Sequence, residues 1–277
     1  MPPQVRLILI SECVMRSTTC KKMFFLILFL VCFCTSYGVV LYSNDFNAGQ
    51  DSLKDFETFT YTYGAGGTSE ITIDSGQLKI HSQGQAKGFA VLNINSMYPQ
   101  YSPILANNPG TITWAFNVSN QNLNSYSNSG CGIAIASSAA NWGYYTSTAY
   151  YLGIGGYVYD RMILAYHGIE TNETPIIDIQ DGLPTLPSKG SFRITYNPSN
   201  SLWCFYGYMG ESYIDPTTVN NLLGSVYDST FTHDNLPYIC FSSSPGIAYI
   251  DNFSLAVIPE PATLLLFALG GLLIKNR

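Results

Sequence analysis

Charged side chains are scarce in this chain of 277 residues: Asp, Glu, Lys and Arg together make up 11% of it. Basic residues are the rarer kind, with 12 Lys and Arg against 18 Asp and Glu, so the formal net charge is −6. Residues 39–257 hold 6 basic and 16 acidic side chains, a net charge of about −10. A protein that binds nucleic acid needs Lys and Arg to neutralise phosphates. This deficit argues against a nucleic-acid-binding protein.

A second absence is helical periodicity. No long stretch repeats apolar residues with the 3.6-residue period of an amphipathic helix. Tyr (21 residues) and Gly (24 residues) are plentiful instead, along with Ser and Asn. A composition rich in these residues and poor in Lys is typical of an extracellular β protein.

Short strand-like runs, separated by polar turns, fill the middle of the chain. We expect a loop at 97–109, which holds three prolines, a strand break at 64–67 and a helical turn at 216–223. So many short strands predict an all-β antiparallel sandwich. The expected strands are 40–46, 56–63, 70–74, 77–81, 89–94, 110–118, 131–136, 149–154, 161–167, 176–179, 191–197, 202–209, 225–227, 238–242 and 246–256.

The first 38 residues have the layout of a secretory signal peptide. Lys21 and Lys22 precede an apolar run at 23–34, and small residues follow up to Gly38, after which we expect cleavage. This predicts export by the Sec pathway, with translation starting at Met15 or Met23 as an open choice. A retained N-terminal anchor is the alternative.

Export would leave three of the seven cysteines in the mature protein, namely Cys131, Cys204 and Cys240. An odd number in an oxidising compartment allows one internal disulfide and leaves one thiol. We predict the pair Cys204–Cys240, because both lie in strand-like runs near the end of the chain. The alternative is three buried cysteines that act as small apolar side chains.

The C-terminal 20 residues combine three features. Pro259-Glu260-Pro261 interrupts any preceding strand, a 13-residue apolar run follows from 262 to 274, and Lys275 and Arg277 form a basic end. As a helix the run is about 20 Å long, short of a comfortable membrane span.

In this order and position, these features resemble the PEP-CTERM sorting signal. The resemblance implies a Gram-negative bacterium that makes exopolysaccharide. It also implies that a short transmembrane helix holds the exported chain in the inner membrane until exosortase cleaves near Pro259-Glu260-Pro261. The chain then divides into a signal peptide at 1–38, an ectodomain at 39–257 and the sorting segment at 258–277.

Three segments of the ectodomain resemble a concanavalin A-like, laminin-G-like jelly roll. They are Y-S-N-D-F-N at 42–47 with the hairpin S-G-Q-L-K-I at 75–80, then 192–206, and finally I-A-Y-I-D-N-F-S-L at 247–255. In such a fold the first and last strands are neighbours, which would bring Asp45 and Asp251 together. Because calcium prefers clustered oxygen ligands, these two carboxylates are candidate Ca²⁺ ligands. Local hydrogen bonding at turns is the alternative role.

Signals for catalysis are missing. No strand carries the closely spaced carboxylates that a glycosidase of this fold would need, and the three histidines lie in no G-x-S-x-G or H-E-x-x-H pattern. Aromatic rings stack on sugars, and the richest aromatic cluster predicts a glycan-binding surface. An aromatic core is the alternative role for these rings. The candidates are Trp142, Tyr144, Tyr145, Tyr150 and Tyr151.

The resulting hypothesis is an exported, non-catalytic surface protein associated with exopolysaccharide or biofilm matrix and able to bind carbohydrate. One alternative is a secreted glycan hydrolase or lyase whose site is assembled from distant residues. Another is a self-associating matrix protein, for which the low-charge strand 110–118 offers a candidate edge.

Overall fold

The computed structural model describes residues 39–99, 101–107, 110–120, 130–140, 147–155, 162–167, 174–179 and 189–258. Within them, Val40–Val257 forms one compact unit. The predicted signal peptide and nearly all of the predicted sorting segment lie outside the described residues. Among the described residues, no helix has both the length and the apolar character that a bilayer span requires.

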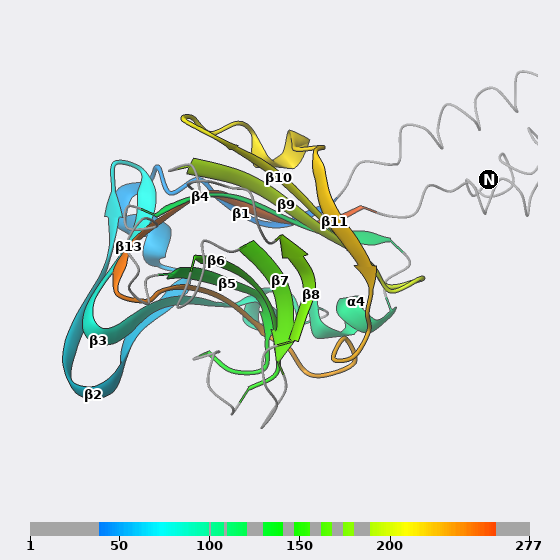
Figure 1. The fold of residues 1–277 in the computed structure, drawn as a ribbon. Helices are drawn as coiled ribbons and strands as arrows, with labels where there is room; N and C mark the ends of the chain where they lie inside the picture. Colours follow the sequence, from blue (N-terminus) through cyan, green and yellow to red (C-terminus); the bar gives the residue numbers. More distant parts are fainter. Residues whose placement is uncertain are drawn as a thin grey trace, which may run out of the picture. The chain divides into compact units, whose positions relative to one another are not determined.

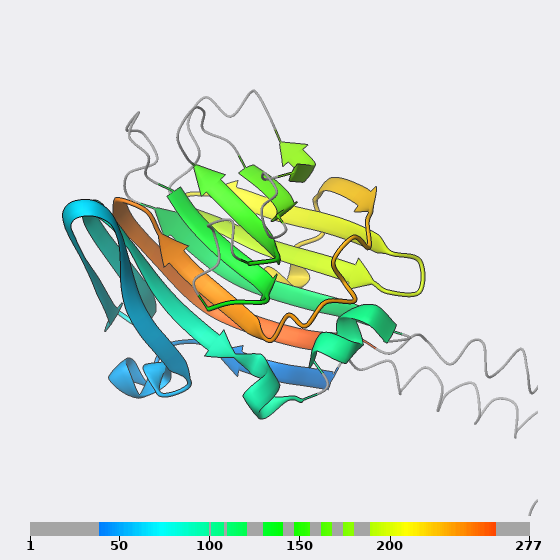
Figure 2. The same cartoon turned by 90° about the horizontal axis from the view of Figure 1, so that it is seen from below.

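Within the described ranges, thirteen strands form a single hydrogen-bonded sheet that folds back on itself into two layers (Figures 1 and 2). One layer contains β1 (Val39–Asn44), β13 (Gly246–Ile258), β4 (Thr111–Asn120), β9 (Lys189–Asn197), β10 (Leu202–Gly210) and β11 (Leu222–Tyr227). The other contains β12 (Tyr238–Ser243), β5 (Gly130–Ser137), β6 (Ala149–Gly155), β7 (Met162–His167) and β8 (Thr174–Ile179). The predicted antiparallel jelly-roll sandwich is confirmed, and β1 pairs with β13 as expected for first and last strands.

A long hairpin of β2 (Phe56–Asp74) and β3 (Gln77–Asn93) joins the two layers. The first part of β3 pairs with β13, and its last part pairs with β12. A Cβ at Gly88 would lie 2.8 Å from Ile80 Cγ2 and 2.9 Å from Ser69 Cβ, so the packing around this part of β3 leaves no room for a side chain. The predicted break at 64–67 is an interruption inside β2 rather than the end of a strand: pairing with β3 stops after Thr62, and the glycines allow a bulge before it resumes at Gly67.

Helical turns cover one end of the sandwich, where the sequence suggested only a loop. The structure has α3 (Ile94–Met97) and α4 (Tyr101–Asn107) there. Pro103 is compatible with α4 because it lies in the first turn, where a backbone N–H has no partner within the helix. Tyr101 and Leu105 bury their side chains in the core, which holds the short helix in place.

The proposed edge at 110–118 is also corrected. This segment corresponds to β4, which lies between β9 and β13 in the sheet order. Its backbone is paired with neighbouring strands on both sides and offers no open edge for self-association.

Aromatic rings from both layers meet in the core. Trp203 on β10 stacks on Tyr196 of β9 and on Tyr150 of β6, with ring centroids 4.3 Å and 4.7 Å away. The hydroxyl of Tyr150 donates to Asp228 Oδ1 at 2.6 Å and accepts from the backbone N–H of Phe231 at 3.0 Å. Burial raises the pKa of Tyr150, so its hydroxyl keeps its proton.

The predicted Cys204–Cys240 disulfide is wrong. None of the three cysteines among the described residues forms a disulfide. Cys204 alternates along β10 with the core residues Trp203 and Phe205, and Cys240 alternates along β12 with residues of the same core. Both cysteine side chains therefore point away from the main core between the layers, and Cys240 packs in a separate apolar cluster. Strands β9, β4, β13 and β3 also separate β10 from β12 in the sheet order.

We expect Tyr150→Phe to lower the free energy of unfolding by about 1–2 kcal/mol, because it leaves a carboxylate and a backbone N–H without their shared partner. Chemical denaturation would measure the change. Tyr227→Phe is the matched control, because Tyr227 is 73% exposed and should leave stability unchanged. Equal stability of the two variants would contradict this role for Tyr150.

The cysteines yield a second prediction. Burial disfavours the thiolate and raises the pKa of Cys131 to about 12, and Cys240 is also buried. Because the thiolate is the reactive form, we expect alkylation of the folded protein first at Cys204, which is partly exposed. Cys131 and Cys240 should react only after denaturation. Mass spectrometry of alkylated peptides would measure the order. A change in mass on reduction of the purified protein would instead reveal a disulfide.

Candidate functional site

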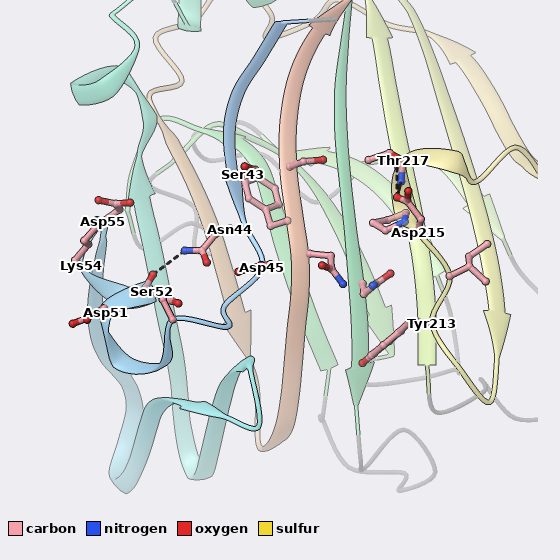
Figure 3. Close-up of a pocket in the computed structure, with 17 residues that line it drawn as sticks. Ser43, Asn44, Asp45, Asp51, Ser52, Lys54, Asp55, Tyr213, Asp215 and Thr217 are labelled. Atoms are coloured by element: carbon pink, nitrogen blue, oxygen red, sulfur yellow. Dashed lines mark hydrogen bonds between the residues drawn. The ribbon is translucent and has the colours of Figure 1, made fainter.

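An open groove of about 780 Å³ lies on the outer face of the layer that contains β1, β13 and β4 (Figure 3). Its lining combines carboxylates, amides and hydroxyls with a few apolar surfaces. The lining residues are Ser43, Asn44, Asp45, Ala48, Asp51, Ser52, Lys54, Asp55, Asn117, Tyr213, Ile214, Asp215, Pro216, Thr217, Asn252, Phe253 and Ser254.

One wall is formed by the end of β1 and the short 3-10 helix η1 (Gly49–Leu53). Asn44 holds the two together: its Nδ2 donates to the carbonyl of Ser52 at 2.8 Å, and its Oδ1 accepts from the backbone N–H of Phe46 at 2.8 Å. The second bond supports Phe46 in a left-handed conformation, with φ 56°, that buries its ring in the core. The wall is therefore anchored from inside the sandwich.

The opposite wall is the connection between β10 and β11, which folds over the outer face of β9. The Ser191 hydroxyl donates to the carbonyl of Ile214 and accepts from its N–H, at 3.1 Å and 3.0 Å. Arg193 Nε donates to the carbonyl of Val219 at 2.7 Å. Two outward-facing side chains of β9 thus fix this wall at both of its ends.

Asp215 lies at the edge of this wall and caps η2 (Pro216–Thr218). Its Oδ1 accepts from the N–H and from the hydroxyl of Thr217, at 2.9 Å and 2.7 Å (Figure 3). This arrangement holds the carboxylate in one position. The predicted helical turn at 216–223 is present but ends at Thr218, since β11 begins at Leu222.

Asn117 on β4 contributes to the floor of the groove. Because Phe116 and Val118 point into the core, the side chain of Asn117 points to the outer face. It is 1% exposed, and its Oδ1 has no hydrogen-bond partner among the residues that the structure describes. A buried amide oxygen in this state is an acceptor that a ligand with a hydrogen-bond donor can satisfy.

Acidic groups dominate the groove. Among the described residues that line it are four acidic ones, Asp45, Asp51, Asp55 and Asp215, and one basic one, Lys54. Hydrogen bonds from the backbone and side chain of Asn47 lower the pKa of Asp45, so this exposed carboxylate is ionised at neutral pH.

The predicted calcium ligands Asp45 and Asp251 are brought near each other. Burial raises the pKa of Asp251, and the negative charge of Asp45 adds to the effect. Among the described residues, however, no three His, Cys, Asp or Glu side chains converge on one point. Calcium at this pair stays a prediction, and it would need amide or carbonyl oxygens to complete its coordination.

The predicted glycan-binding cluster is only partly described. Trp142, Tyr144 and Tyr145 lie outside the described residues. Tyr150 is corrected to a core residue, because its ring is fully buried between the layers. Tyr151 is 5% exposed and packs in a small apolar cluster with residues of β3, β5, β7 and β12.

Sequence reasoning missed the groove because its residues come from distant parts of the chain. Two local signals were available. Asn117 is a polar residue at an outward position of an otherwise apolar strand, and Asp215-Pro216-Thr217 has the pattern of a capped helical turn. Neither signal showed that the two segments share one surface.

Comparisons with solved structures find only distant likenesses. A metal-free carbohydrate recognition domain of Emp46p is 12% identical, covers 78% of this chain and 95% of its own, and has a TM-score of 0.48. The botulinum neurotoxin serotype D/C VPI 5993 binding domain is 14% identical, covers 78% of this chain and 48% of its own, and has a TM-score of 0.49. This chain thus spans less than half of that toxin chain. The fold assignment rests on the strand pairing described above.

No curated protein matches the chain. One protein-family model does, the PEP-CTERM protein-sorting motif, over residues 257–277. The match covers the predicted motif Pro259-Glu260-Pro261 and the basic end at Lys275 and Arg277, which lie outside the described residues. The C-terminus of this chain is therefore a PEP-CTERM sorting motif, the mark of an exported protein that exosortase processes at the cell envelope.

Proposed function

We propose that the exported domain is a non-catalytic saccharide-binding module and that the groove between η1 and the β10–β11 connection is its binding site. The observation that carries this proposal is the lining of the groove. Amide, hydroxyl and carboxylate groups from five segments of the chain share it with Tyr213 and Pro216.

Such a lining suits a sugar because sugar hydroxyls both donate and accept hydrogen bonds. Asn and Ser side chains also do both, and carboxylates accept from hydroxyl groups. The Tyr213 ring supplies an apolar face against which the C–H surface of a sugar ring can pack. The groove is open rather than enclosed, which fits a segment of a longer polysaccharide.

A glycan hydrolase is the second candidate, because four carboxylates share the groove and such enzymes need two. The acid of the pair must keep its proton near neutral pH, which requires a raised pKa. In the groove, the pKa of Asp45 is lowered instead, and Asp251, whose pKa is raised, does not line it. Asp45 therefore does not suit the role of the acid.

The sorting motif supports the remaining parts of the proposal. A Gram-negative cell would export the chain through the Sec pathway, hold it in the inner membrane by the C-terminal apolar segment and release it after exosortase cleavage. The domain would then associate with the exopolysaccharide of the cell surface or biofilm matrix.

We expect the purified domain, residues 39–258, to bind at least one polysaccharide from exopolysaccharide-producing bacteria. Asn117→Ala and Tyr213→Ala should each weaken binding by roughly 2- to 10-fold, because each removes about one hydrogen bond or one packing face. Isothermal titration calorimetry would measure the affinity.

Two controls locate the site. Tyr227→Ala removes an exposed aromatic ring outside the groove and should leave affinity unchanged. If Trp142→Ala abolishes binding while both groove variants bind normally, the predicted aromatic cluster is the site instead. Release of reducing ends from the bound polysaccharide would replace the proposed function with hydrolysis.

We also expect replacement of Pro259-Glu260-Pro261 by three alanines to trap the full chain in the inner membrane of an exosortase-containing host. The reason is that the apolar segment would still insert, but the processing enzyme would lose its recognition motif. Cell fractionation and immunoblotting would follow the chain. The same accumulation should appear for the natural sequence in a host that lacks exosortase, and normal release there would contradict the proposal.

A further inference from the structure

The groove carries far more hydrogen-bond acceptors and negative charge than a neutral sugar would need. The described lining holds four Asp residues and one Lys, a formal charge of −3. An ionised carboxylate accepts hydrogen bonds and donates none. A ligand that fills this groove therefore has to supply donors, and positive charge on it would be favoured.

The buried oxygen of Asn117 is an independent sign of a missing donor. It belongs to a side chain that is 1% exposed and faces the groove, and no described residue is its hydrogen-bond partner. Leaving a buried acceptor unpaired is costly, and native proteins seldom do so unless water or a ligand completes it. This acceptor belongs to the sheet itself rather than to the acidic walls.

The acidic groups are spread along both walls rather than gathered at one point. Asp45, Asp51 and Asp55 belong to the β1–η1 wall, whereas Asp215 belongs to the β10–β11 wall (Figure 3). No three acidic, His or Cys side chains among the described residues could surround a single metal ion. A distributed set of carboxylates matches a ligand with several separate cationic groups.

The far wall is held in place before any ligand arrives. Thr217 fixes the Asp215 carboxylate, and the Lys189 ammonium lies 5.4 Å from the ring centre of Tyr213. The Lys189 ammonium therefore faces the ring of Tyr213, and Lys189 is not one of the residues that line the groove. A carboxylate already held in its binding position loses little conformational entropy on binding.

We propose that the groove binds an amino-sugar oligosaccharide and recognises its ammonium groups through Asp215 and the acidic β1–η1 wall. This inference rests on the proposed saccharide-binding function and adds the class of sugar. Each ammonium group offers three donors and no acceptor, and its hydrogen bonds to carboxylates are charge-assisted. The sugar hydroxyls supply donors for Asn117 and partners for the Ser and Asn side chains of the floor. Sugars that carry carboxylates are disfavoured by repulsion.

Three tetrasaccharides of equal length test the inference by calorimetry: glucosamine, N-acetylglucosamine and galacturonic acid oligomers. We expect the glucosamine oligomer to bind at least about 10-fold more tightly than its N-acetylated form, because acetylation removes the charge from every amine. Raising the salt from about 0.1 M to about 1 M should reduce this preference, since it shortens the screening length from about 10 Å to about 3 Å.

Asp215→Asn is the informative variant, because Asn also caps helices well and differs from Asp mainly in charge. It should cut the preference for glucosamine over N-acetylglucosamine by about 10-fold. Asp234→Asn is the matched control: it makes the same charge change at an exposed residue outside the groove and should keep the preference.

The outcomes separate this inference from the proposed function. If the acetylated or uronic acid oligomer binds as tightly as the glucosamine oligomer, the amino-sugar inference fails while saccharide binding stands. If no oligosaccharide or polysaccharide binds, both fail. If spermidine or an oligolysine peptide binds more tightly than the glucosamine oligomer and the preference depends on Asp215, the groove recognises cationic groups of another class.

Discussion

The stack of aromatic rings around Trp203 is the contact on which the rest of this sandwich depends. Trp203, Tyr196 and Trp114 come from one layer and Tyr150 comes from the other, so the stack fastens the two layers face to face. Asp228 completes it, since its carbonyl accepts from Trp203 Nε1 at 3.0 Å and its carboxylate accepts from the Tyr150 hydroxyl. Each aromatic pair adds about 0.5–1.5 kcal/mol beyond its buried area. The polar edges of the buried Trp203 and Tyr150 are thereby paired as well.

The same strands that carry this core build the groove on their other face. Side chains alternate along a strand, so Phe116 faces the core and Asn117 faces the groove. On β9, Phe192 and Ile194 pack inside while Ser191 and Arg193 hold the β10–β11 connection outside. Core packing therefore fixes the positions of the polar groups that would meet a ligand. The floor of the groove is the sheet, and hydrogen bonds from Ser191 and Arg193 hold the β10–β11 wall against it.

Strand β13 connects the fold to the sorting signal. It pairs with β1, β3 and β4 and ends at Ile258, directly before Pro259. Asn252 and Ser254 of β13 also line the groove. The strand nearest the sorting motif in the sequence is thus central to both the sheet and the candidate site. Proline at 259 suits this boundary because it cannot continue a paired strand.

The sequence by itself determined the class of fold and the sorting tail. Alternation of apolar and polar residues identified most strands, because that signal is local, and the C-terminal motif was readable from its order and position. Expectations failed where tertiary contacts prevailed, as three examples show. Gly64–Gly67 lies within a strand rather than ending one. Cys204 and Cys240 lie in different layers and point away from the core between them, and Tyr150 is a core residue. The groove was decided by the tertiary structure alone, since it joins segments from Ser43 to Ser254 that are adjacent only once the sheet has folded.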